Sequence, residues 1–102
     1  MYYVYILANK RRGTLYIGMT SDLLKRVYEH KNNLDPKSFT TRYHLHRLVF
    51  CELCENSHSA IIREKQIKNM SRKDKLALVR RSNPTLRDLY EDVLGRIPDK
   101  PE

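Results

Sequence analysis

The sequence is short of cysteine, and its two cysteines do not form a pattern typical of a metal centre. Cys51 and Cys54 make a single CxxC, with His58 following. A zinc site needs four ligands and usually a second ligand pair, and a redox CxxC usually opens a helix instead of ending a strand. We therefore expect both cysteines to be reduced core or edge residues, as in a cytosolic protein.

Long apolar runs are also missing. No segment approaches the ~20 apolar residues that cross a membrane, and Met1 leads directly into strand-like sequence instead of a basic and then apolar leader. The length of 102 residues fits one domain with a modest core. We expect a soluble, cytoplasmic protein without a membrane partner.

Acidic residues are scarce relative to basic ones. Twelve Asp and Glu stand against twenty Lys and Arg, which gives a net charge of +8. The basic excess lies in residues 1–51 and 63–81, whereas residues 82–102 are mildly acidic. Nucleic acid is the commonest large polyanion for such a protein. The alternative is that the net positive charge has no binding partner and only keeps the protein soluble.

Alternating apolar and polar residues predict three strands. The segments are 2–7, 14–20 and 46–54, and a loop containing Gly13 joins the first two into a hairpin. In the second strand the apolar side chains at 15, 17 and 19 share one face, and Tyr16 and Gly18 share the other. A glycine there leaves room for a close neighbour such as a phosphate or another backbone.

Helices are predicted between and after these strands. Ser21 can cap the first, with Leu23 and Val27 on its apolar side. Further helices are predicted from Ser57, from a capping box at Ser71 and, after Asn83-Pro84, over 86–94. Residues 32–45 read as a long surface connection. The expected order is β-β-α-β-α-α, with a domain over 1–94 and a polar tail over 95–102.

Four features of the sequence, in their order along the chain, resemble those of the GIY-YIG nucleases. A first strand reads "YVY" and keeps the tyrosine of the family motif as Tyr5, although the glycine is missing, and "YIG" follows at 16–18. The first helix carries Arg26 and His30 in an R-x-x-x-H spacing, and Glu64 lies in the helix after the third strand. The ending "NPTLRDLY" resembles the small stand-alone bacterial members, with Leu86 where they often have Trp.

The resemblance implies a fold and an activity. The fold is α/β, a small three-stranded and mainly antiparallel sheet flanked by helices. The activity is metal-dependent endonuclease cleavage of phosphodiester bonds in DNA, with Mg²⁺ or Mn²⁺ as cofactor. It further implies a role in DNA repair or recombination, with a preference for DNA structure over base sequence.

Roles for five residues follow from the resemblance and from what phosphodiester hydrolysis needs. Tyr16 acts as general base or orients the attacking water, and Arg26 holds the scissile phosphate through its fork of donors. Glu64 carries the divalent cation. His30 assists as a proton relay or phosphate contact, and Tyr5 positions the water or the metal shell.

Weaker substrate contacts are predicted for Gly18, Lys65, Lys68 and Asn83. Two of these predictions have simple structural alternatives. Glu64 and Lys68 are four residues apart and can form an ordinary helix ion pair, and an Asn before Pro is a normal helix stop.

Two other functions stay open from the sequence. One is a nucleic-acid-binding module with a nuclease-like fold and little or no cleavage, in which the segments 63–81 and 37–47 make salt-sensitive phosphate contacts. The other is a protein-interaction adaptor, which would show no salt-dependent DNA binding. A single site of this kind cuts one strand, so a double-strand break would need two protomers or two encounters.

Overall fold

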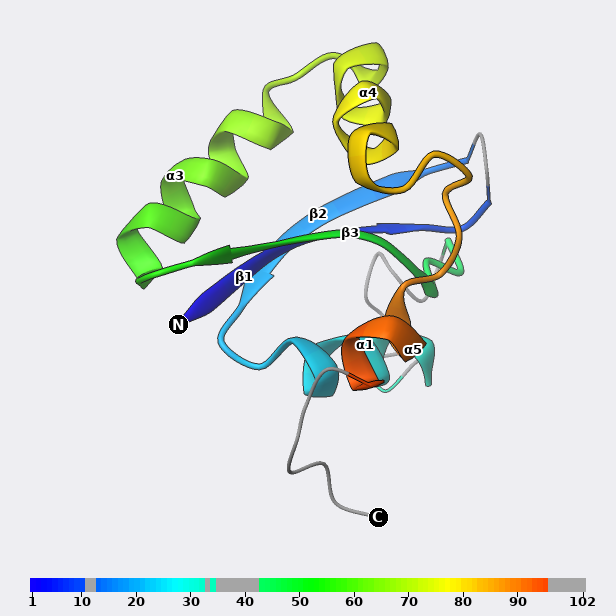
Figure 1. The fold of residues 1–102 in the computed structure, drawn as a ribbon, viewed down its shortest axis with the longest axis horizontal. Helices are drawn as coiled ribbons and strands as arrows, with labels where there is room; N and C mark the ends of the chain where they lie inside the picture. Colours follow the sequence, from blue (N-terminus) through cyan, green and yellow to red (C-terminus); the bar gives the residue numbers. More distant parts are fainter. Residues whose placement is uncertain (11–12, 33, 35–42, 96–102) are drawn as a thin grey trace.

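The structure is a computed structural model that describes residues 1–10, 13–32, 34 and 43–95. The elements in these ranges are β1 (Tyr2–Ala8), β2 (Leu15–Thr20), α1 (Leu23–Lys31), β3 (Arg47–Cys54), α3 (Ser57–Lys68), α4 (Arg72–Ser82) and α5 (Tyr90–Gly95) (Figure 1). The predicted order of elements is confirmed, and α5 is the short last helix that was predicted after Asn83-Pro84. Most of the predicted connection over 32–45, and the tail beyond 95, lie outside the described residues.

The strands form an antiparallel sheet in the order β2-β1-β3, as predicted. The central strand β1 pairs with both neighbours, so Tyr5 lies opposite Gly18 on one side and Cys51 on the other. The β1 and β3 ladder shifts register between Ile6 and Leu7. This irregularity adds a residue to β3, because Ile6 pairs with Phe50 while Leu7 pairs with Leu48.

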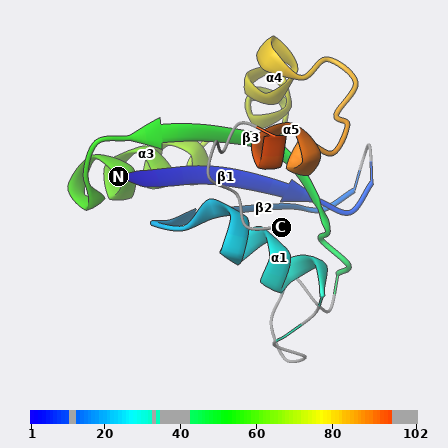
Figure 2. The same cartoon turned by 60° about the horizontal axis from the view of Figure 1, so that its bottom comes forward.

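Helices cover both faces of the sheet. Figure 1 shows α3 and α4 on one side and α1 and α5 on the other, and the turned view in Figure 2 again separates α1 from α4 across the strands. The face under α3 and α4 buries an almost wholly aliphatic cluster: Val4, Ile6, Ala8, Ile17, Val49, Phe50, Ala60, Ile67, Val79 and Leu86. The face under α1 and α5 buries a cluster that contains Tyr5, with Tyr3, Tyr16 and Tyr90 packed against it.

Side-chain caps fix the helix starts. Ser71 caps α4 as predicted, because its Oγ accepts a hydrogen bond from the Asp74 backbone N–H at 3.1 Å. The prediction for α1 was wrong by one residue. Asp22, not Ser21, is the cap, and its Oδ1 accepts from the Lys25 N–H at 3.2 Å.

The last helix starts later than predicted. Leu86 is buried with a positive φ of 53°, a backbone conformation that cannot continue into a helix. Helix α5 therefore begins only at Tyr90, whose backbone N–H donates to Asp88 Oδ1 at 3.0 Å.

Two of the predicted absences can be compared with the fold. Cys51 and Cys54 are half-buried and form no disulfide with each other. Of the helices in the described ranges, none has the length and apolar character needed to cross a membrane.

Candidate active site

The space beside Gly18 is occupied by a tyrosine. A Cβ placed on Gly18 would lie 2.7 Å from the Tyr5 hydroxyl oxygen and 3.0 Å from Cε1 of Tyr16. Both contacts are shorter than normal van der Waals separations. The close neighbour of Gly18 is therefore the Tyr5 side chain from the strand directly opposite, and not a phosphate or another backbone as predicted.

Three rings from three elements converge at this point. The ring centroid of Tyr5 on β1 lies 6.3 Å from that of Tyr16 on β2 and 6.0 Å from that of His30 on α1. The Tyr16 and His30 centroids are 5.7 Å apart. The Tyr5 hydroxyl and His30 Nε2 are hydrogen-bonded at 3.2 Å. Three of the predicted catalytic residues are thus in direct contact.

The hydrogen-bonded pair is neutral near pH 7. Burial, with a smaller effect of Tyr16, raises the pKa of Tyr5 to about 12, although the neighbouring Arg26 guanidinium opposes this rise. Burial and then the positive charge of Arg26 lower the pKa of His30 to about 4. The fold thus suppresses the charged forms of both residues, as expected for polar groups held away from water.

Access to solvent distinguishes the two tyrosines. Tyr5 is only 1% exposed and its hydroxyl contacts His30. Tyr16 is half-buried, and it lies on β2, an edge strand of the sheet. A substrate can therefore reach Tyr16 more easily than Tyr5.

Arg26 lies at the exposed rim of these rings. Its side chain is 45% exposed, and Nη1 lies 3.5 Å from Glu29 Oε1 one turn along α1. Its guanidinium affects the pKa of both Tyr5 and His30, which places it close to the pair. Arg26 therefore joins the cluster as predicted, with donors open to an incoming anion.

Glu64 lies on α3, which packs against β1 and β2 on the opposite face of the sheet from the rings. Its side chain is only 18% exposed, and its charge contributes to the raised pKa of Tyr5. Glu64 Oε1 accepts a hydrogen bond from Lys68 Nζ at 2.8 Å, so the simple i,i+4 ion pair does form. Lys65, the next residue along α3, is exposed.

The site offers few carboxylates, which suits a cation that keeps most of its bound water molecules. No group of three or more His, Cys, Asp or Glu gathers anywhere in the part of the chain that the structure describes. Mg²⁺ is commonly held by one or two carboxylates, with water and substrate phosphate in its remaining positions. Glu64 is the residue that would hold such an ion here. The cysteine-rich set of a structural zinc site is not present in these ranges.

The prediction for Asn83 needs correction. Its side chain is buried and its amide is fully engaged with the backbone: Nδ2 donates to the Val49 carbonyl at 3.1 Å and to the Arg87 carbonyl at 2.8 Å, and Oδ1 accepts from the Arg87 N–H. These bonds satisfy the side chain internally and fasten the chain after α4 to β3. We therefore assign Asn83 a structural role instead of a phosphate contact.

Asp88 is a residue of the site's framework that the sequence analysis missed. It forms an ion pair with Lys31 at the end of α1, and Oδ1 accepts from the Leu48 N–H at 3.1 Å. Lys31 also lies 5.1 Å from the ring centroid of Tyr90. These contacts hold α1, and with it His30, against β3 and α5. The available signal was "DLY", whose Asp we noted without a role.

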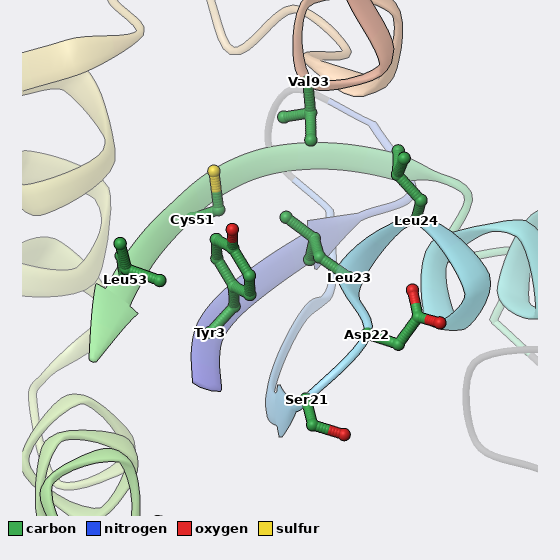
Figure 3. A pocket seen from close by; sticks show the side chains of 8 residues that line it. All are labelled: Tyr3, Ser21, Asp22, Leu23, Leu24, Cys51, Leu53 and Val93. Atoms are coloured by element: carbon green, nitrogen blue, oxygen red, sulfur yellow. The ribbon is translucent and has the colours of Figure 1, made fainter. Parts of the chain in front are cut away.

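A second hollow lies on the same face of the sheet as the rings. Its volume is about 480 Å³, and Figure 3 shows its lining from β1, β3, the start of α1 and α5. Tyr3 and Leu53 border it at one end, and Val93 closes it from α5. The lining is mainly apolar, and none of the predicted catalytic residues contributes to it.

Comparisons with known proteins agree with this geometry. The sequence model of the GIY-YIG catalytic domain matches residues 1–77. A UPF0213 protein of Syntrophus aciditrophicus (strain SB) is 36% identical over 80 residues, which cover 78% of this chain and 91% of that protein. A UPF0213 protein of Clostridium perfringens (strain 13 / Type A) is 40% identical over 79 residues, which cover 78% and 83% respectively.

A solved structure is similar as well. The solution NMR structure of a UPF0213 protein from Bacillus halodurans matches with a TM-score of 0.51 and 29% identity, over 80% of this chain and 85% of that one. The matched range 1–77 includes the three rings together with Arg26 and Glu64, whereas Asn83 and Asp88 lie beyond it.

Proposed function

Because this chain belongs to the GIY-YIG family, we propose that it is a divalent-metal-dependent endonuclease that hydrolyses phosphodiester bonds in DNA. The observation that carries the proposal is the convergence of Tyr5, Tyr16 and His30 within about 6 Å of one another. Arg26 and Glu64 add a cation and a carboxylate on the borders of this cluster.

Tyr16 is the residue proposed to meet the attacking water. It combines contact with the cluster and access from the β2 edge. In its phenolate form Tyr16 takes a proton from the water, or in its hydroxyl form it orients the water, as the water attacks phosphorus. Arg26 binds two oxygens of the scissile phosphate through its planar fork and neutralises the charge that grows on them.

Tyr5 and His30 are proposed to keep Tyr16 in place and to relay protons. Their hydrogen bond at 3.2 Å is formed between neutral partners. A neutral imidazole can accept a proton on one nitrogen while it donates from the other, so the pair can pass a proton without creating a buried charge.

Glu64 is proposed to hold the divalent cation, Mg²⁺ or Mn²⁺. Such an ion supplies positive charge to the phosphoryl oxygens and to the departing alkoxide. To bind it, Glu64 must exchange its bond with Lys68, which is 51% exposed and can turn toward solvent or toward the DNA backbone.

The biological substrate is proposed to be branched, nicked or otherwise irregular DNA met in repair or recombination. One site of this kind cuts one strand. A double-strand break would therefore require two protomers or two successive encounters.

The test is a cleavage and binding assay on duplex, nicked, single-stranded and branched DNA, with and without Mg²⁺ or Mn²⁺. We expect nicking only with the metal, and a loss of at least 100-fold in Glu64→Gln. Glu55→Gln is the matched control, because Glu55 is an exposed carboxylate in the link between β3 and α3.

Each contrary result identifies another function. Cleavage that persists in Glu64→Gln contradicts the proposed metal ligand. Salt-sensitive binding without cleavage on any substrate identifies a nucleic-acid-binding module instead. Absence of both identifies a protein-interaction adaptor.

A further inference from the structure

Helix α4 carries positive charges that the proposed cleavage site does not use. Five described cations outside α4 are paired with acids: Arg26 with Glu29, Lys31 with Asp88, Arg63 with Glu52, Lys68 with Glu64 and Arg87 with Asp92. On α4, by contrast, Lys73, Lys75, Arg80 and Arg81 have no ion pair or hydrogen bond with any other described side chain.

Three of these cations, Lys73, Arg80 and Arg81, lie on the solvent side of α4. Val79 is fully buried against the sheet, and Leu76 packs with it. Residues 73, 77, 80 and 81 recur at helical spacing on the opposite side, and all four are exposed. From Lys73 to Arg80 the helix rises about 10 Å, which corresponds to about three phosphates along one DNA strand.

The basic surface is joined to the cluster of rings. Arg72, the first residue of α4, donates from Nη2 to the Gly13 carbonyl at 2.6 Å. Gly13 lies in the loop that leads into β2, three residues before Tyr16. Lys68, which contacts Glu64, is in the last turn of α3 and directly precedes the short link to α4. The start of α4 is thereby fixed near the β2 edge.

We propose that Lys73, Arg80 and Arg81 bind the phosphate backbone of a duplex arm that flanks the strand to be cut. This inference rests on the proposed function and adds the part of the substrate that lies outside the cleavage site. Lys and Arg without acidic partners are the groups that contact phosphates, and each contact releases counterions from DNA.

The composition of α3 and α4 favours duplex over single-stranded DNA. Single-strand binding surfaces use aromatic side chains on which bases stack, and neither helix contains Phe, Trp or Tyr. Helix α4 also contains no Asn or Gln, the side chains that read adenine. The described segment around α5 does not offer a similar surface, because it contains Asp88, Glu91 and Asp92.

The experiment measures the affinity of the full chain for a short duplex and for a single strand of equal length. EDTA is present to prevent cleavage, and the salt concentration is varied. Arg80→Gln is compared with Arg87→Gln, since each removes one positive charge from an exposed arginine. A triple variant, K73Q/R80Q/R81Q, amplifies the effect, and circular dichroism verifies the fold of each protein.

The expected results follow from counterion release. Arg80→Gln weakens duplex binding about fivefold to tenfold near 0.1 M salt and reduces the slope of log K against log salt by about 0.9, and the triple variant reduces it by about 2.7. Arg87→Gln leaves both quantities nearly unchanged. Single-strand binding falls less than duplex binding in the α4 variants.

Two results would overturn the inference. One is an equal loss in Arg80→Gln and Arg87→Gln, which would reflect net charge alone, and the other is no loss in the triple variant. Failure of the proposed function is seen separately. If wild type binds duplex through α4 but cuts nothing with Mg²⁺, the endonuclease proposal fails and the α4 surface stands.

Discussion

The two faces of the sheet are built from different chemistry. Under α3 and α4 the buried side chains are aliphatic apart from Phe50, and the helices above them present a basic surface to solvent. Under α1 and α5 the sheet carries tyrosines, with the buried His30 packed onto them. One face thus supplies stability with few polar groups, and the other holds polar groups that are costly to bury.

The difference shows how a domain of this size accommodates a polar site. Burial of Tyr5 and His30 is tolerated because each satisfies the other through their hydrogen bond. The aliphatic face stabilises the fold independently of that pair. Glu64 is the exception, since it reaches the site from a helix of the aliphatic side. The comparison predicts that activity and stability can be changed separately.

Removing one hydroxyl from the polar face should have the largest effect. Tyr16→Phe keeps the ring against His30 but removes the proposed proton acceptor, so we expect cleavage to fall about 10²-fold to 10⁴-fold with little change in the free energy of unfolding. Single-turnover cleavage with Mg²⁺ and urea unfolding measure the two quantities. Tyr3→Phe, on the same face, is the control, and comparable losses in both variants would argue against the role of Tyr16.

A cavity in the aliphatic face should have the converse effect. Ile6 is fully buried there, and Ile6→Ala is expected to lower the free energy of unfolding by about 2–5 kcal/mol. Cleavage per folded molecule should stay within a few-fold of wild type. If the alanine variant does not fold, Ile6→Val provides the same test at about 0.5–1.5 kcal/mol. A large loss of activity at full folding would show that the two faces are coupled.

Acidic pH should lower the free energy of unfolding, because it favours the charged form of His30, which is buried on the polar face. Its pKa is about 4 in the fold against about 6.5 in the unfolded chain, so between these values the unfolded state binds more protons. The stability that the neutral imidazole confers is complete above pH 6.5 and falls as the pH drops to 4, by up to about 3 kcal/mol. Urea unfolding of wild type and His30→Gln over pH 4–7 measures it. Parallel curves for the two proteins would contradict this prediction.

Local signals were enough for much of the fold. The alternation in "TLYIGMT" predicted which face each residue of β2 occupies. The prediction of Ser71 as the cap of α4 was correct because the accepting Ser71 hydroxyl and the donating Asp74 N–H are only three residues apart. At the start of α1 both Ser21 and Asp22 are good caps. The choice depends on Thr20, whose Oγ1 accepts from the Asp22 N–H at 3.1 Å, and composition alone does not reveal this contact.

Contacts between residues far apart in the sequence could not be predicted from such local signals. Asn83 looked like a helix stop or a phosphate contact, because nothing nearby shows that the Val49 carbonyl, 34 positions earlier, accepts from its amide. The late start of α5 follows from the buried, positive-φ Leu86, a tertiary constraint that overrides helix propensity. The grouping of Tyr5, Tyr16 and His30 was predicted through the resemblance of the sequence to a family motif. The direct contact between Gly18 and the Tyr5 ring needed the strand register.

The ion pair between Lys31 and Asp88 also sets an order of events during synthesis. The two residues are 57 positions apart, so α1 is complete long before the carboxylate that fastens it exists. At typical translation rates this interval lasts about 3 to 10 s. During it, α1 lacks the ion pair that holds its end against β3 and α5. The proposed site of a nascent chain should therefore stay incompletely braced until residue 88 has been added.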